Sequence, residues 1–156
     1  MADQRNGWVL IVEDEKEFAE TLAQRLGREG FRVQTTSKVS EASTKIKNQR
    51  FACILLDIKL EQGSGDQVVA IARMNKTGFN YKTPILIMSG ALGKDTLSKI
   101  AKEIAGVLIK PFEQEALVTK MKQVIKAAEE AAVAEAVAQE KALREAAEKE
   151  TNKSDF

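Results

Sequence analysis

Five short apolar runs, rich in β-branched residues, recur along the chain. They are WVLIV, FRVQT, ACILL, ILIM and GVLI, at Trp8–Val12, Phe31–Thr35, Ala52–Leu56, Ile85–Met88 and Gly106–Ile109. Each has the length and composition of a β-strand. Most of them are continuously apolar instead of alternating with polar residues. This pattern predicts strands buried on both faces, and therefore a parallel sheet between two layers of helices.

The segments between these runs carry apolar residues at helical spacing. Examples are Phe18, Leu22 and Leu26 after the first run, Val68, Val69 and Ala72 after the third, and Leu97, Ile100, Ala101 and Ile104 after the fourth. Strands and helices therefore alternate five times. The expected fold class is α/β, a doubly wound five-stranded parallel sheet with helices on both faces.

The last predicted helix follows Pro111 and has no visible stop. No Gly or Pro occurs from Glu113 to about Glu150, and residues 127–147 include ten alanines among charged residues. That composition has high helix propensity but little capacity to form a core. We therefore expect one domain over residues 1–126 and an alanine- and glutamate-rich helical extension over residues 127–156.

Length and composition restrict the class of protein. A chain of 156 residues with 30% charged residues suits one globular domain with an appendage. No apolar run approaches the roughly 18 residues that a membrane span requires. The start, MADQRNG, does not resemble a secretory signal, and the single cysteine, Cys53, has no disulfide partner. We expect a cytoplasmic protein without a membrane span.

Charge and aromatic content argue against a nucleic-acid partner. The net charge is +1 and aromatic residues make up 5% of the chain, with no cluster of basic residues. Histidine is absent. This excludes acid–base catalysis by histidine and most zinc sites.

Polar residues follow four of the five predicted strands. Glu13 and Asp14 end the first, Asp57 the third, Ser89 the fourth and Lys110 the fifth. The carboxyl ends of parallel strands meet at one edge of a sheet. Singly, each residue is explained as a helix cap, a turn former or a solvated charge. Together, three acids would repel one another without a cation, and Mg²⁺ is the cation that carboxylates favour.

Four stretches resemble, in order and spacing, the response-regulator receiver domain of two-component signalling. They are LIVEDE, LLDIKLEQGSG, LIMSG and LIKPF, and the resemblance extends from about Trp8 to Lys126. Within that family the sequence is similar to the stand-alone, chemotaxis-regulator-like type, here with an extended C-terminal helix. The resemblance implies the flavodoxin-like strand order 2-1-3-4-5.

The resemblance also implies a phosphoacceptor and a metal site. Asp57 would attack a phosphoryl donor and become an aspartyl phosphate. Mg²⁺ would be held by Asp14 and Asp57, by Glu13 through water, and by the backbone carbonyl of Lys59. The phosphoryl donor would be a sensor histidine kinase or a phosphotransfer protein. Apart from self-phosphorylation and slow self-dephosphorylation, the domain is expected not to be an enzyme.

Two further residues are assigned to the phosphoryl group by the same resemblance. Lys110 would pair with a phosphoryl oxygen, or with Asp57 before transfer, and Ser89 would donate a hydrogen bond after transfer. The sequence departs from the family at Val107, where the family usually has an aromatic switch residue. Lys59 and Ala91 occupy variable positions beside the acceptor, and Glu61 stands where the family often has proline.

Three alternative functions are weighed against this interpretation. A phosphohydrolase of the haloacid dehalogenase type needs a second Asp where this chain has Lys59. A flavin-mononucleotide module needs a hydroxyl-rich loop in place of VEDEKEF. A pseudo-receiver would signal without phosphorylation although all five polar positions are retained. The expected output is contact with an unidentified downstream protein, with a homodimer through the final helix or the last sheet edge as an open alternative.

Overall fold

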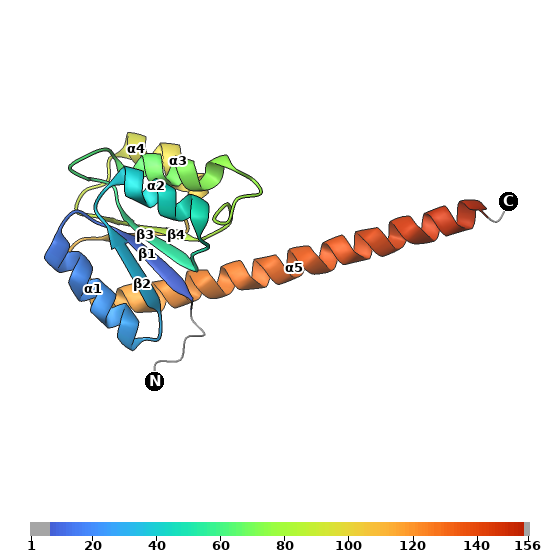
Figure 1. The fold of residues 1–156 in the computed structure, drawn as a ribbon, viewed down its shortest axis with the longest axis horizontal. Coiled ribbons are helices and arrows are strands. Elements are labelled where there is room, and N and C mark those ends of the chain that lie inside the picture. The colour runs from blue at the N-terminus through green and yellow to red at the C-terminus, as the bar shows by residue number, and fades with distance from the viewer. Residues whose placement is uncertain (1–6, 155–156) are drawn as a thin grey trace. The chain divides into compact units, whose positions relative to one another are not determined.

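The computed structural model describes residues 7–154, which form one sheet and six helical elements (Figure 1). In chain order these are β1 (Trp8–Val12), α1 (Lys16–Arg28), β2 (Arg32–Thr36), α2 (Val39–Asn48), β3 (Cys53–Asp57), α3 (Gly65–Met74), β4 (Ile85–Ser89), α4 (Lys94–Ile100), the 3₁₀ helix η2 (Ala101–Glu103), β5 (Gly106–Ile109) and α5 (Gln114–Ser154).

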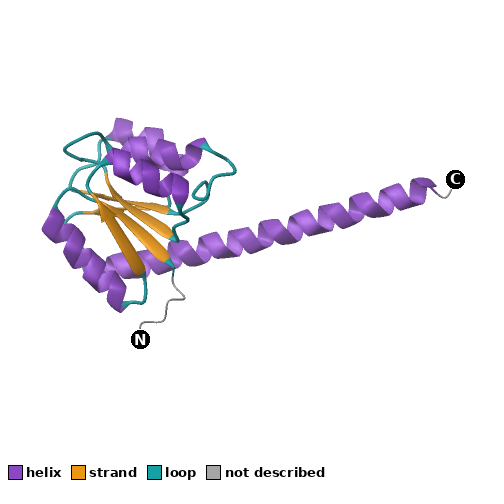
Figure 2. Ribbon diagram, viewed as in Figure 1, coloured by secondary structure: helices purple, strands orange, loops and turns teal. Residues whose placement is uncertain are grey.

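The five strands form a parallel sheet in the order β2-β1-β3-β4-β5, and helices cover both of its faces (Figure 2). The central strands β3 and β4 are buried at every position. This burial explains why the runs are continuously apolar, because each side chain of a central strand meets a helix layer on one face or the other. The predicted fold class and strand order are confirmed.

Alternation along each strand divides the core into two layers. Leu10 and Val12 of β1 belong to the layer under α2 and α3, whereas Val9 and Ile11 belong to the layer under α1 and the start of α5. Successive side chains of a strand point to opposite faces, so one apolar strand serves both layers. The sheet is thereby held rigidly between the helices, and the ends of its strands are well defined positions.

Three strands differ from their predicted bounds by one residue. β2 begins at Arg32 instead of Phe31, which is buried just before the strand. β3 and β4 extend to Asp57 and Ser89, so each of these two polar residues is the last residue of a strand. Both belong to the ladder itself, where their backbone positions are set by neighbouring strands.

The helix after β4 is shorter than its apolar spacing predicts. The expectation of helical spacing through Ile104 is wrong, because α4 ends at Ile100 and a 3₁₀ turn follows. The guanidinium of Arg73 donates hydrogen bonds to the Glu103 carbonyl at 3.2 and 2.9 Å and holds this turn. Of the seven residues of α4, Ile100 alone is buried, and Leu97 is 38% exposed. The helix is therefore weakly anchored to the core.

The predicted long C-terminal helix is confirmed as α5. The chain divides into two compact units, Met1–Ile125 and Lys126–Phe156, and α5 contributes residues to both. In the first unit, Leu117, Val118 and Met121 are buried in the core. Among the described residues of the second, the large apolar side chains are exposed. They are Val133, Val137 and Leu143, at 64%, 60% and 71% exposure.

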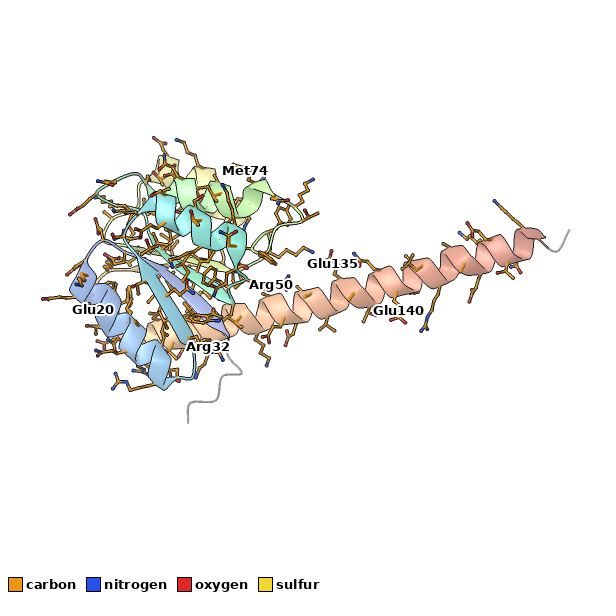
Figure 3. The ribbon with its side chains drawn as sticks, viewed as in Figure 1. Glu20, Arg32, Arg50, Met74, Glu135 and Glu140 are labelled. Atoms are coloured by element: carbon orange, nitrogen blue, oxygen red, sulfur yellow. The ribbon has the colours of Figure 1, made fainter. Side chains whose placement is uncertain are left out.

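Over its described residues, 126–154, the second unit is helical throughout, and local side-chain pairs support the helix. Figure 3 shows charged side chains such as Glu135 and Glu140 along it, and Glu140 accepts a hydrogen bond from Arg144 one turn later, at 2.6 Å. Such pairs add a few tenths of a kcal/mol each to helix stability, roughly 0.2–0.5. Among the residues described, no helix has the apolar length that a membrane crossing needs.

Candidate functional site

Four strands deliver polar side chains to the same edge of the sheet. Asp57 and Ser89 end β3 and β4, Glu13 follows β1, and Lys110 follows β5. Backbone hydrogen bonds continue the ladders there, from the Glu13 N–H to the Thr36 carbonyl at 3.0 Å and from the Lys110 N–H to the Ser89 carbonyl at 2.8 Å. The backbone of the site is therefore as firmly placed as the sheet.

Three carboxylates converge at this edge. One carboxylate oxygen from each of Glu13, Asp14 and Asp57 lies within 4.8 Å of the others. Glu13 is 3% and Asp57 7% exposed, while Asp14 is half-buried. Carboxylate oxygens are the hard ligands that magnesium prefers, and because Mg²⁺ keeps several waters and is usually bound directly by one or two carboxylates, this cluster offers enough ligands for it.

The ammonium of Lys110 lies between two of these carboxylates. Its Nζ donates to Oε2 of Glu13 at 2.9 Å and to Oδ2 of Asp57 at 3.1 Å. Both contacts are charge-assisted hydrogen bonds in a partly desolvated site, where such bonds are strong. The ammonium thereby compensates two acids that would otherwise repel each other.

Burial and pairing shift two ionisation equilibria in the site. Burial of the Glu13 carboxylate raises its pKa, and the charge of Asp57 adds to this, although the hydrogen bond from Lys110 opposes it. Burial lowers the pKa of Lys110, but its bonds to Glu13 and Asp57 outweigh burial, so the pKa lies above its ordinary value. Lys110 is therefore charged near neutral pH.

Backbone N–H groups hold two of the carboxylates from the β3–α3 loop. The Lys59 N–H donates to Oδ1 of Asp57 at 3.0 Å, and the Glu61 N–H donates to Oδ2 of Asp14 at 3.0 Å. Asp57 thus has one oxygen on a backbone amide and the other on Lys110. Its carboxylate is oriented before any ligand binds.

Gly65 allows α3 to begin directly beside Asp57. A Cβ at this position would overlap the Asp57 carbonyl oxygen and lie 2.9 Å from the Cα of Ile58. The Gly65 N–H donates to the Ile58 carbonyl at 2.9 Å, and the Ser64 hydroxyl donates to the same carbonyl at 3.3 Å. The loop is folded back on the strand end in a way that leaves no room for a side chain.

The Ser89 hydroxyl is buried and donates to the Ala91 carbonyl at 2.9 Å. Ser89 therefore stands at the same sheet edge as the acids, with its proton directed into its own loop. Val107, at the position of the expected aromatic switch, is half-buried and packs against the core layer under α2 and α3. Ile109, two residues later in β5, is apolar and 57% exposed.

Two aromatic rings adjoin the site, and sequence reasoning assigned neither of them to it. The Lys110 Nζ lies 4.5 Å from the centroid of the Phe18 ring, and Phe18 packs edge-to-face with Phe112, with centroids 5.9 Å apart. The sequence pattern places Phe18 in the apolar stripe of the first helix. The signal available was its position in the turn after the acidic pair, which faces the carboxyl ends of the strands.

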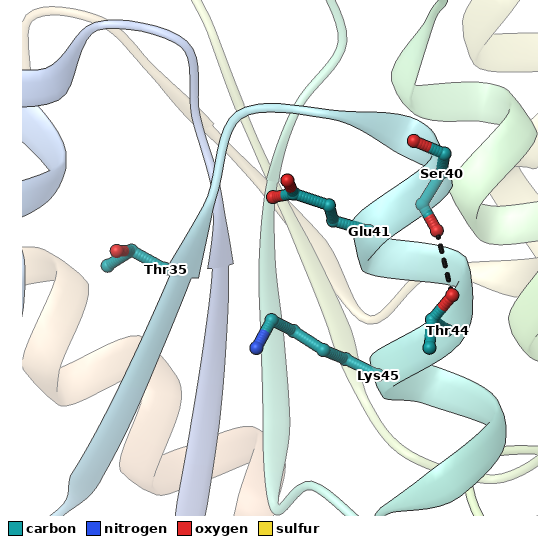
Figure 4. A pocket seen from close by; sticks show the side chains of 5 residues that line it. All are labelled: Thr35, Ser40, Glu41, Thr44 and Lys45. Atoms are coloured by element: carbon teal, nitrogen blue, oxygen red, sulfur yellow. Dashed lines mark hydrogen bonds between the residues drawn. The ribbon is translucent and has the colours of Figure 1, made fainter.

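The structure thus brings together Glu13, Asp14, Asp57 and Lys110 by side chain and Lys59 by its backbone. The roles assigned to them, and to Ser89, stay predictions. A separate surface pocket lies between β2 and α2 and is lined by Thr35, Ser40, Glu41, Thr44 and Lys45 (Figure 4). None of the predicted site residues lines it.

Comparison with known proteins gives a consistent result. The family model of the response regulator receiver domain matches residues 9–122. The cell cycle response regulator CtrA of Brucella ovis is 31% identical over 119 residues, which are 76% of this chain and 50% of that protein. The chain therefore spans about half the length of the curated relatives it matches.

Solved structures support the same fold. Chemotaxis protein CheY4 of Vibrio cholerae is 28% identical with a TM-score of 0.68, over 76% of this chain and 98% of that one. A CheY-like receiver domain protein of Methanospirillum hungatei is 22% identical with a TM-score of 0.73, over 80% of this chain and 97% of that one.

Two glycine substitutions of the same kind are expected to have opposite effects. Gly65→Ala should lower the free energy of unfolding by about 1–3 kcal/mol, because the new methyl group overlaps the Asp57 backbone. Gly27→Ala, in α1, should raise it by up to about 1 kcal/mol, since apart from its chain neighbours and the backbone of its own helix no atom lies within 4 Å of the new methyl group. Urea unfolding of both variants measures this. Equal effects would contradict the close approach at Gly65.

Proposed function

The chain belongs to the response-regulator receiver domain family, and on that premise we propose that it is a phosphoacceptor switch of two-component signalling with Asp57 as the acceptor. The observation that carries this proposal is the convergence of Glu13, Asp14 and Asp57 at one sheet edge, where Lys110 pairs with Glu13 and Asp57. An oxygen of Asp57 bonds to phosphorus as the bond from phosphorus to the donor breaks. The donor is a sensor histidine kinase or a phosphotransfer protein.

The metal ligands in this proposal are Asp14, Asp57, the backbone carbonyl of Lys59 and, through water, Glu13. Magnesium bound there supplies positive charge next to the transferring phosphoryl group. The protein's own residues prepare the site for it. The Lys59 and Glu61 N–H groups orient Asp57 and Asp14, and the three carboxylates keep a net negative charge that a single ammonium does not cancel.

Lys110 and Ser89 respond to the new phosphoryl group. Lys110 exchanges its hydrogen bond to the Asp57 carboxylate for one to a phosphoryl oxygen. Ser89 releases the Ala91 carbonyl and donates to the phosphoryl group instead. The loop from Ser89 to α4 then changes shape, and α4 follows because Ile100 is its one buried residue. No aromatic ring takes part at Val107.

We also propose an output for the C-terminal part of the chain. Residues 127–156 serve as a contact extension to the receiver domain of residues 1–126, and Val133, Val137 and Leu143 form its contact stripe. This stripe would bind a downstream protein or a second copy of this chain. The alternative surface for a homodimer is the edge strand β5, where Ile109 is exposed. A cytoplasmic location fits Cys53, a free thiol buried in the core.

Phosphorylation is tested directly by mass spectrometry. Incubation with acetyl phosphate and Mg²⁺ should add one phosphoryl group per chain, and Asp57→Asn should abolish the addition because the nucleophile is lost. A chelator should also stop it, since the acids then repel the donor. Asp95→Asn, an exposed acid of α4 outside the site, is the control. Labelling that persists in Asp57→Asn would refute the assignment, and an unlabelled wild type would favour a pseudo-receiver.

Ser89 is tested by hydrogen exchange. Ser89→Ala should leave Asp57 open to phosphorylation but diminish the change in amide exchange over residues 90–104, because the donor that reads the phosphoryl group is missing. Ser98→Ala, an exposed position within α4, should respond like the wild type. If the changes in Ser89→Ala and the wild type are equal, Ser89 does not perform the readout.

The contact stripe is tested by light scattering of the full chain. Val137→Glu combined with Leu143→Glu should lower the measured mass or abolish partner binding, while phosphorylation is unaffected. Ala138→Glu combined with Ala142→Glu, on the opposite face of the same helix, introduces the same two charges and should have no effect. If the two double variants behave alike, the stripe is not a contact surface.

A further inference from the structure

The lysine of the site is in contact with an aromatic ring as well as with two carboxylates. The Lys110 Nζ lies 4.5 Å from the Phe18 ring centroid, within the roughly 6 Å at which a cation is attracted to the face of a ring. Its bonds to Glu13 and Asp57 use two of the three ammonium donors. The ring therefore occupies part of the space around the ammonium that the two carboxylates leave open, beside a charge that is already partly desolvated.

The Phe18 ring is itself held in place from two sides. Phe112 meets it edge-to-face at an interplanar angle of 72°, an arrangement that aromatic pairs favour over parallel stacking. Both rings pack against the core layer that contains Val9 and Ile11. Phe18 comes from α1 and Phe112 from the segment after β5, so the two rings join these elements beside Lys110, and Phe18 is the ring that meets the ammonium. The ring is a fixed surface for the ammonium.

A fixed surface matters because lysine is a flexible side chain. Its four-carbon stem has about 2 kcal/mol of rotamer entropy, and its compact charge is strongly hydrated in water. In the resting site Glu13 and Asp57 both attract the ammonium, at 2.9 and 3.1 Å. An aromatic face beside it excludes water from that side and attracts the charge without providing a competing hydrogen-bond acceptor.

We propose that Phe18, supported by Phe112, is a positioning residue that keeps the Lys110 ammonium directed at Asp57. This inference rests on the proposed phosphoacceptor function, and it adds a residue from α1 to the groups that set the rate of phosphoryl transfer. The ring acts through Lys110 and does not touch the phosphoryl group.

The contact is tested first in the resting protein, without phosphorylation. The ε-methylene protons of Lys110 should show upfield ring-current shifts in a ¹H–¹³C NMR spectrum. Phe18→Leu should remove these shifts and Phe18→Tyr should retain them. Equal Lys110 shifts in Phe18→Leu and the wild type would overturn the contact and, with it, the proposal.

The functional part is tested by the rate of phosphorylation from acetyl phosphate at saturating Mg²⁺. Phe18→Leu should lower this rate about three- to fivefold, the size expected for loss of one cation–π contact. Phe18→Tyr should restore at least half of the wild-type rate. Phe31→Leu, the same substitution at a buried position of the same core layer, should keep the wild-type rate.

The outcomes separate this inference from the function on which it rests. A wild-type rate in Phe18→Leu, or an equal loss in Phe31→Leu, would overturn the positioning role while Asp57 remains the acceptor. A wild-type protein that is never labelled would overturn the proposed function and the role of Phe18 in transfer together. A loss in Phe18→Leu with rescue by Phe18→Tyr supports both.

Discussion

The bonds from Lys110 to Glu13 and Asp57 are the interactions on which the site depends. Two carboxylates at 3% and 7% exposure have lost most of their water, and removing an ion from water costs several kcal/mol unless it is paired. The ammonium pairs with both acids at once, and backbone N–H groups bind the remaining oxygens. With Asp14 the cluster still has more negative than positive charge. This excess of negative charge is the electrostatic basis of the proposed divalent-cation site.

The core that stabilises the fold also places this charge cluster. β1, β3 and β4 are buried by helices on both faces, so their carboxyl ends cannot shift relative to one another without disturbing two layers of packing. Phe18 belongs to the core and the site together, because it packs in the layer under α1 and also meets the Lys110 Nζ. In contrast to these strands, α4 has one buried residue and is held weakly. The contrast between a fixed site and a weakly held helix is what a conformational response requires.

The sequence by itself determined the sheet, its two helix layers and the edge at which Glu13, Asp57, Ser89 and Lys110 gather. Apolar runs and helical spacing are local patterns, and in a parallel sheet the position of a residue at a strand end places it at a known edge. The C-terminal helix was equally predictable, because alanine and i,i+4 pairs make it helical without any core. The resemblance to the receiver family then supplied the strand order, which the structure confirms, and a predicted role for each residue.

Tertiary structure alone decided the directions of the side chains and the contacts across elements. The proton of Ser89 points to Ala91, Glu61 binds Asp14 through its backbone, and Phe18 meets Lys110 from a helix 92 positions earlier in the chain. The early end of α4 likewise depends on Arg73, which reaches the Glu103 carbonyl from α3. The contacts of Glu61, Phe18 and Arg73 join residues far apart in the chain, and spacing along a sequence does not contain them because only packing brings such residues together. The bond from Ser89 to Ala91 is local, but it depends on the conformation of the loop after β4, which the sequence pattern does not specify.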